Sequence, residues 1–179
     1  MKVCVYGASS NEISEEYLNA GFRLGELMAQ NGMELVFGGG DTGMMGAVNR
    51  GIRKCGGKSI GVAPRFFDVP GILSIECTEF IFTDTMRQRK QKMEDLADAF
   101  IMTAGGIGTF EEFFEILTLK QLRQNDRPLL ILNTDGYFDE LIQLLKSTVE
   151  KGFMTGNVLK LFDVVNTPDD AVTLLRSNG

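Results

Sequence analysis

The chain has 179 residues, of which 44% are hydrophobic and 23% charged, a composition typical of a globular protein with a sizeable core. Its formal net charge of -6 argues against non-specific nucleic-acid binding, and no apolar run approaches the roughly 20 residues of a membrane-spanning helix. Histidine is absent, which excludes Ser-His and Cys-His triads and disfavours a catalytic zinc. Any chemistry must therefore use carboxylates, Arg, Lys, Tyr or backbone groups.

Strands and helices alternate along the chain. Apolar runs predict strands at residues 3–6, 34–37, 59–63, 80–82, 99–102, 128–133 and 162–165. Apolar faces, caps and stop signals predict helices at residues 14–31, 44–55, 84–96, 109–122, 137–151 and from 167 onward. The strands lack polar alternation, which is typical of a parallel sheet covered on both faces. We therefore predict a single domain, residues 1–179, with a Rossmann-like doubly wound α/β fold.

Three further features are the N-terminus, the cysteines and an irregular segment. The N-terminus begins directly with a strand and lacks a signal-peptide pattern, so we expect a cytoplasmic protein. The cysteines Cys4, Cys55 and Cys77 are far apart and in no metal-ligand spacing, which favours buried, reduced thiols. Residues 64–74 are irregular and form either a packed connection or a lid.

Three turns rich in glycine or serine follow predicted strands, at residues 7–10, 38–43 and 105–109. In doubly wound folds such turns meet at the carboxyl edge of the sheet, where ligands bind. The third turn leads into a helix, whose free N–H groups and dipole favour a phosphate. It matches neither the G-x-G-x-x-G nor the Walker A pattern. The alternative is a tight turn that only closes a strand–helix unit.

An acidic group follows this turn. Thr109-x-x-Glu112 fits a capping box, so the spacing leaves a capping role and a catalytic role for Glu112 equally open. Glu111, Glu112 and Glu115 together exceed what the helix dipole needs. A carboxylate near a phosphate is costly unless it faces the sugar, which favours a functional role for at least one acid.

The preceding helix carries two cations on a face marked by methionines. Met86, Arg89, Lys90 and Met93 share one helix face, which we predict to point inward, whereas Arg87, Gln88, Gln91 and Lys92 point away. Buried cations need an anionic partner, which would be Glu112, a bound phosphate, or both.

Together these residues resemble the LONELY GUY (LOG) family of cytokinin-activating nucleoside 5′-monophosphate phosphoribohydrolases. Its P-G-G-x-G-T-x-x-E motif matches residues 104–112 with Ala104 in place of Pro, and its M-H-x-R-K run matches residues 86–90 with Arg87 in place of His. Four further segments match family motifs: Tyr6–Ser10, the glycine-rich element Gly38–Gly40 and Gly43–Gly46, Asn133–Asp139, and a segment with Thr118 and Gln121. In the last of these, Leu119 replaces Trp. Such proteins are often labelled lysine decarboxylases, but no motif here indicates a pyridoxal phosphate site.

The resemblance implies hydrolysis of the N-glycosidic bond of a purine nucleoside monophosphate, with no metal or organic cofactor, at a homodimer interface. It implies Arg89 and Glu112 as catalytic residues. The expected substrate-binding residues are Ser10, Gly39, Gly40, Met86, Lys90, Gly105, Gly106, Ile107, Gly108, Thr109, Glu111 and Thr118. The alternative is a nucleotide- or cofactor-binding carrier of the same fold without turnover. No nucleic-acid or membrane partner is expected.

Overall fold

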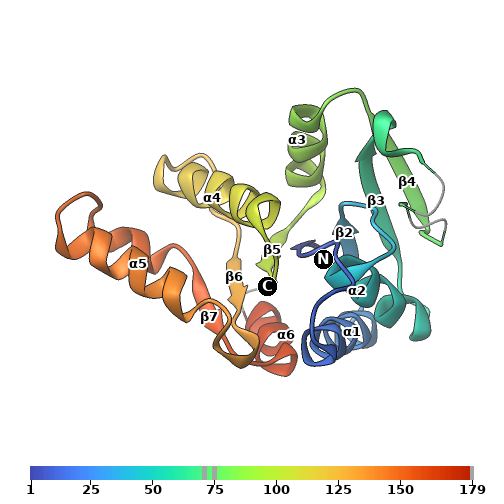
Figure 1. Ribbon diagram of the computed structural model, residues 1–179, viewed down its shortest axis with the longest axis horizontal. Helices are drawn as coiled ribbons and strands as arrows, with labels where there is room; N and C mark the ends of the chain where they lie inside the picture. Colours follow the sequence, from blue (N-terminus) through green and yellow to red (C-terminus); the bar gives the residue numbers. More distant parts are fainter. Residues whose placement is uncertain (70–71, 74–75, 178–179) are drawn as a thin grey trace.

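The computed structural model describes residues 1–69, 72–73 and 76–177. Within these residues, the strands form one seven-stranded parallel sheet in the order β4-β3-β2-β1-β5-β6-β7 (Figure 1). The strands are β1 Lys2–Tyr6, β2 Glu34–Phe37, β3 Ser59–Pro64, β4 Glu79–Thr83, β5 Ala99–Met102, β6 Leu129–Leu132 and β7 Asp163–Val165.

Helices cover both faces of this sheet, as Figure 1 shows. One face carries α1 (Glu15–Gln30), α2 (Gly43–Lys54) and α6 (Pro168–Ser177). The other carries α3 (Met86–Leu96), α4 (Ile107–Gln121) and α5 (Asp139–Glu150). Short 3-10 helices occupy Arg65–Phe67, Thr134–Gly136 and Gly156–Lys160. The predicted doubly wound α/β fold is therefore confirmed.

The first strand shows why the strand sequences are continuous apolar runs. Val3 and Val5 pack in the core layer beneath α1, α2 and α6, whereas Cys4 and Tyr6 pack in the layer beneath α3, α4 and α5. Successive side chains of a strand point to opposite faces, and here both faces are buried. The strand consequently needs apolar residues at every position.

Several sequence-based expectations differ from the structure. Helix α4 begins two residues before the predicted Thr109, because Gly106 occupies the N-cap position. Helix α3 begins at Met86, where Thr85 and Gln88 form a complete capping box. Cys4 is buried as predicted, but Cys55 is exposed. In the segment predicted to be irregular, Pro64 is the last residue of β3, and a 3-10 helix follows it. Residues 70, 71 and 74 of this segment lie outside the described residues.

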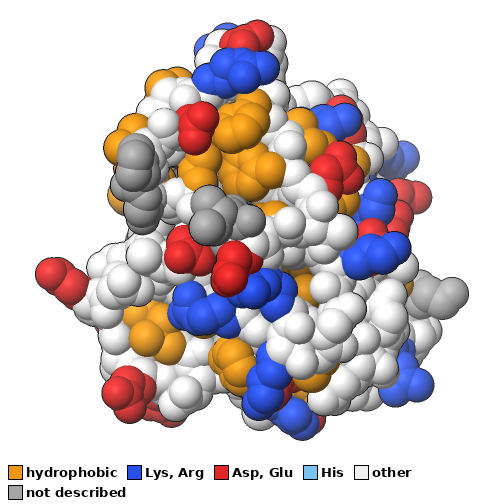
Figure 2. All heavy atoms as spheres, turned by 90° about the vertical axis from the view of Figure 1, so that its right-hand side faces the viewer, with side chains coloured by type: hydrophobic (Ala, Val, Ile, Leu, Met, Phe, Trp, Pro, Cys, Tyr) orange, Lys and Arg blue, Asp and Glu red, His pale blue; other side chains and the backbone are white. Residues whose placement is uncertain are grey.

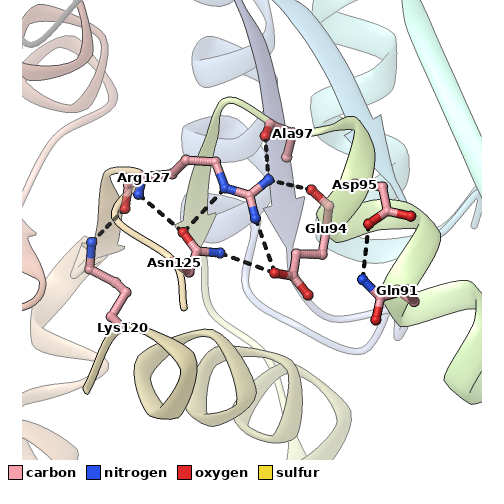
Figure 3. Close-up of polar contacts among 7 residues, drawn as sticks. All are labelled: Gln91, Glu94, Asp95, Ala97, Lys120, Asn125 and Arg127. Atoms are coloured by element: carbon pink, nitrogen blue, oxygen red, sulfur yellow. Dashed lines mark hydrogen bonds and ion pairs between the residues drawn. The ribbon is translucent and has the colours of Figure 1, made fainter. Parts of the chain in front are cut away.

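A polar cluster fixes the C-terminal end of α3 (Figure 3). The Arg127 guanidinium donates hydrogen bonds to the carbonyl oxygens of Glu94 and Ala97 at 2.6 and 2.8 Å. It also contacts the Glu94 carboxylate at 3.0 Å and Asn125 Oδ1 at 3.2 Å, and it lies over the Phe100 ring. Carbonyls at a helix C-terminus lack partners within the helix and favour a cation. Arg127 thus ties the far end of α3 to the segment that enters β6.

The sheet edge at β4 carries both apolar and charged side chains. Figure 2 shows this side of the molecule, with hydrophobic side chains gathered in its upper part and acidic and basic side chains together below them. Phe66, Phe67, Val69 and Ile72 are exposed hydrophobic residues. Arg53, near the end of α2, pairs with Glu76, which precedes β4. Among the described residues, no helix is both long and apolar enough to cross a membrane.

Candidate active site

The strand order reverses between β1 and β5. From β1 the chain proceeds to β2 and β3 on one side, and from β5 it proceeds to β6 and β7 on the other. The connections after these neighbouring strands therefore diverge and leave a crevice at the carboxyl edge, the usual ligand position in this fold class. A cavity of about 440 Å³ lies here, lined by residues 7–10, Met45, Phe67, Arg89, residues 106–109 and Glu112.

A second cavity of about 370 Å³ adjoins the first. The two share Ser9, Met45, Phe67 and Arg89. The second also reaches Gly38, Gly40, Thr42, Ile72 and Leu73. All three predicted turns thus contribute to one continuous site, as the carboxyl edge of a parallel sheet requires.

The N-terminus of α4 forms one wall of the first cavity. Phe110 N donates to Gly106 O at 3.0 Å, so the N–H groups of the preceding residues have no partner within the helix. A Cβ added at Gly106 or Gly108 would meet nothing within 4 Å, which leaves the cavity in front of these amides open. Gly105 differs, because a Cβ there would lie 2.2 Å from Thr109 Oγ1. Gly105 serves the packing of the turn, and the other two glycines serve access to its amides.

A buried ion pair lies at the junction of the two cavities. Arg89 Nη1 lies 2.7 Å from Glu112 Oε1, and the two side chains are only 9% and 10% exposed. Arg89 Nε donates to the Val62 carbonyl at 3.2 Å. Burial raises the pKa of Glu112, and the adjacent Arg89 opposes that rise. The inward orientation predicted for Arg89 and its pairing with Glu112 are both observed.

Glu112 is not a helix cap. The N-cap of α4 is Gly106, and no side-chain cap hydrogen bond is formed there. Thr109 is instead the third residue of the helix, so of the two roles left open for Glu112 the capping role does not apply. The Glu112 carboxylate is turned toward Arg89 and the cavity.

Gly38, Met45 and Phe67 line the site but were not predicted as binding residues from the sequence. A Cβ at Gly38 would lie 2.2 Å from Arg89 Nη2, so only glycine lets the guanidinium occupy its place. Gly38 is the first residue of the turn that contains the predicted Gly39 and Gly40. Its position beside them is the feature of the sequence that could have indicated its role. Gly39 itself has φ of 74° and packs against Phe80 rather than lining either cavity. Phe67 comes from an irregular segment that gives no periodic signal.

Besides Gly39 and Gly105, four predicted residues lie outside the two cavities. Lys90 pairs with Glu111, and with Glu115 at 3.1 Å. Glu111 and Thr118 line a separate hollow on the outer side of α4. Met86 is 38% exposed, so its predicted inward orientation is wrong, although Met93 is fully buried. Met86 is the first residue of α3, where the helix extends past the core.

Comparisons with known proteins agree on one family. A family model described as possible lysine decarboxylase matches residues 45–175. A cytokinin riboside 5′-monophosphate phosphoribohydrolase of Mycobacterium tuberculosis is 36% identical over 95% of this chain and 90% of its own. A probable enzyme of the same name from Oryza sativa subsp. japonica is 34% identical over 98% of this chain and 71% of its own.

Solved structures show the same fold in a protein of another description. The molybdenum cofactor binding protein from the phototrophic bacterium Rippkaea orientalis matches with a TM-score of 0.76, covering 98% of this chain and 95% of its own. Its sequence identity is 22%, so the likeness establishes the fold alone.

Proposed function

This chain belongs to the family described as possible lysine decarboxylase, which includes cytokinin riboside 5′-monophosphate phosphoribohydrolases, and from this premise we propose its reaction. It hydrolyses the N-glycosidic bond of a purine nucleoside 5′-monophosphate, of cytokinin or AMP type, to free base and ribose 5-phosphate. The observation that carries the proposal is the buried Arg89–Glu112 pair, which faces the cavity beside the N-terminus of α4.

The phosphate would bind at the start of α4. The amides of Gly106, Ile107, Gly108 and Thr109 border the cavity and belong to the helix terminus, which favours an anion. Fixing the 5′-phosphate there would hold the sugar in one place relative to Glu112. Such positioning lowers the activation barrier, because the entropy cost of orienting the sugar is met when the substrate binds. Ser10 and Gly40 line the adjoining walls, where we place further substrate contacts.

Glu112 would act on the anomeric carbon. As the C–N bond breaks, the sugar develops oxocarbenium-like positive charge, which a nearby carboxylate stabilises. The same carboxylate can accept a proton from the attacking water, whose oxygen becomes the new hydroxyl of ribose 5-phosphate. The electron pair of the broken bond leaves with the base, whose nitrogen takes up one proton. The attacking water gives one proton to Glu112, so the net reaction consumes one water and no further proton. Burial raises the pKa of Glu112 and thereby makes it a stronger base than an exposed glutamate.

Arg89 would hold Glu112 and clamp the substrate. A guanidinium offers a positive charge and N–H donors, so Arg89 serves as an electrostatic contact to phosphate or sugar and not as the acid that protonates the base. The second cavity, with Met45, Phe67, Ile72 and Leu73 in its lining, would take the base.

We also propose a homodimer in which the outer side of α4 takes part. The hollow lined by Glu111, Phe114, Glu115, Thr118 and Leu119 lies outside the two cavities and is open to solvent in the protomer. A partner there would place the expected residues Lys90, Glu111 and Thr118 at an interface. Met86, Gly39 and Gly105 would support the site from outside the cavities. Light scattering on the purified protein measures the mass in solution, and a monomer at all concentrations would contradict the dimer.

The decisive experiment measures turnover. The protein is incubated with AMP and with isopentenyladenine riboside 5′-monophosphate, and chromatography separates any free base. The wild type is expected to release base, and Glu112→Gln is expected to lose this activity. Glu140→Gln is the matched control, because Glu140 is an exposed acid in the first turn of α5. If the wild type binds nucleotides but releases no base from a broad panel, the carrier alternative replaces the hydrolase.

A further inference from the structure

The segment that follows β6 has a defined structure that the proposed reaction does not explain. Asn133 organises it: its Nδ2 donates to Asp139 Oδ1 at 2.8 Å, and its Oδ1 accepts from Phe138 N at 2.7 Å. Asn133 is buried, and its carbonyl also accepts from Gly136 N at 3.3 Å. These contacts close a compact turn over residues 133–139.

The backbone of this turn is strained. Asp135 has φ of 51°, a left-handed conformation that is costly for a residue other than glycine, and Gly136 follows with φ of 68°. Strain of this kind persists only where the surrounding contacts fix it, and it is concentrated at functional sites. The residue that the strained turn presents is Tyr137.

Tyr137 reaches the glycine-rich turn before α4. Its hydroxyl donates a hydrogen bond to the Gly105 carbonyl at 2.8 Å. The neighbouring carbonyl, that of Ala104, accepts from Ala8 N at 3.0 Å. Two successive carbonyls of the turn are therefore held by segments that follow other strands. Tyr137 itself lines neither of the two cavities formed by the described residues.

The Gly105 carbonyl controls the first amide of the anion site. The carbonyl of Gly105 and the N–H of Gly106 belong to one planar trans peptide and point in opposite directions. Fixing the oxygen therefore fixes the direction of the Gly106 N–H, which borders the cavity. Neither glycine has a side chain to restrict its own backbone, so the restraint must come from outside.

We propose that Tyr137 is a positioning residue that holds the phosphate-binding turn in its anion-accepting orientation. The proposal rests on the proposed function in so far as the anion is the phosphate of a nucleoside monophosphate. The Tyr137 ring is itself held by edge contacts with Tyr17 and Phe138, at centroid distances of 5.6 and 4.8 Å. The hydroxyl is thus delivered at a defined position, and its removal should weaken phosphate binding without unfolding the segment.

The test compares ligands with and without phosphate. Calorimetry measures the dissociation constants of ribose 5-phosphate and of adenosine for the wild type, Tyr137→Phe and Tyr17→Phe. Loss of one hydrogen bond predicts that Tyr137→Phe binds ribose 5-phosphate about fivefold to tenfold more weakly. Its affinity for adenosine should match that of the wild type. Tyr17→Phe is the matched control, because it alters a ring that touches Tyr137 without removing the bond to Gly105.

Each outcome decides the proposal. Unchanged affinity of Tyr137→Phe for ribose 5-phosphate, equal weakening for both ligands, or no binding of ribose 5-phosphate by the wild type overturns it. Failure of the proposed reaction is distinguishable, since a wild type without turnover can still bind ribose 5-phosphate more tightly than Tyr137→Phe does. With turnover present, the AMP KM of Tyr137→Phe should rise by the same factor while kcat stays within about twofold.

Discussion

Replacing Gly38 with alanine should displace Arg89, the arginine of the proposed active site, without altering any ionisable group. Gly38 does not have a positive φ, so alanine introduces no backbone strain there. The added Cβ would, however, lie 2.2 Å from Arg89 Nη2 and 3.3 Å from Arg89 Cζ. The arginine side chain cannot swing aside freely, because it is buried and bound to the Val62 carbonyl and to Glu112.

The expected effect follows from the size of this overlap. The guanidinium must retreat by about 1 Å to restore an ordinary van der Waals separation. A displacement of about 1 Å in a catalytic constellation reduces the rate by about a hundredfold. A hundredfold loss corresponds to about 2.7 kcal/mol of transition-state stabilisation. Because Gly38 lies at the edge of the site, we expect this loss in kcat/KM with the fold retained.

The assay is release of free base from AMP, measured as kcat/KM beside a thermal unfolding curve. Gly156→Ala is the matched control, since its added Cβ would be 3.9 Å from the nearest atom, on the Val149 side chain. That control should behave as the wild type. A Gly38→Ala enzyme whose kcat/KM lies within threefold of the wild type would refute the reasoning, because the arginine would then have no defined position to lose.

Two further predictions concern single groups. Burial raises the pKa of Glu112, so carboxyl NMR of the ligand-free protein, with Glu112→Gln assigning the signal, should give a midpoint above the ordinary 4.5. Since the pKa of Glu112 is raised in the folded state, its contribution to the free energy of unfolding should fall as pH rises from 4.5 through that midpoint. A midpoint at or below 4.5 would contradict both the raised pKa and this fall in stability. Arg127→Ala should lower the free energy of unfolding in urea by about 2–3 kcal/mol, because it frees helix carbonyls and the Glu94 carboxylate. Gln91→Ala, which removes an exposed contact to Asp95, should change it by less than about 0.5 kcal/mol, and equal losses would exclude the capping role of Arg127.

The sequence predicts the sheet well because burial on both faces leaves a clear pattern. Every strand predicted from an apolar run is present, and β1 shows the reason in its division between two core layers. The order of the strands in the sheet cannot be predicted in the same way, since an apolar run does not indicate which strands it pairs with. The crevice between β1 and β5 was accordingly expected only as a general property of the fold class.

The pairing of Arg89 with Glu112 could be predicted because a buried charge needs a partner of opposite charge. Arg89 shares a helix face with Met93, and a buried cation requires an anion, which is Glu112. The start of α4 was misplaced because Thr109 and Glu112 have the spacing of a cap, whereas the cap is Gly106, whose role depends on backbone geometry alone. Phe67 was missed because a 3-10 helix in an irregular segment has no periodic pattern.

The structure shows where the three departures from the family motifs lie relative to the cavities. Arg87 is exposed, and Leu119 lies on the outer side of α4, so neither change touches the cavities. Ala104 is the one departure within the glycine-rich turn, and alanine lacks the ring by which proline restricts the backbone. Its carbonyl is held by Ala8, and the next carbonyl is held by Tyr137. Two hydrogen bonds therefore restrain a turn that lacks a proline ring, and Tyr137 supplies one of them.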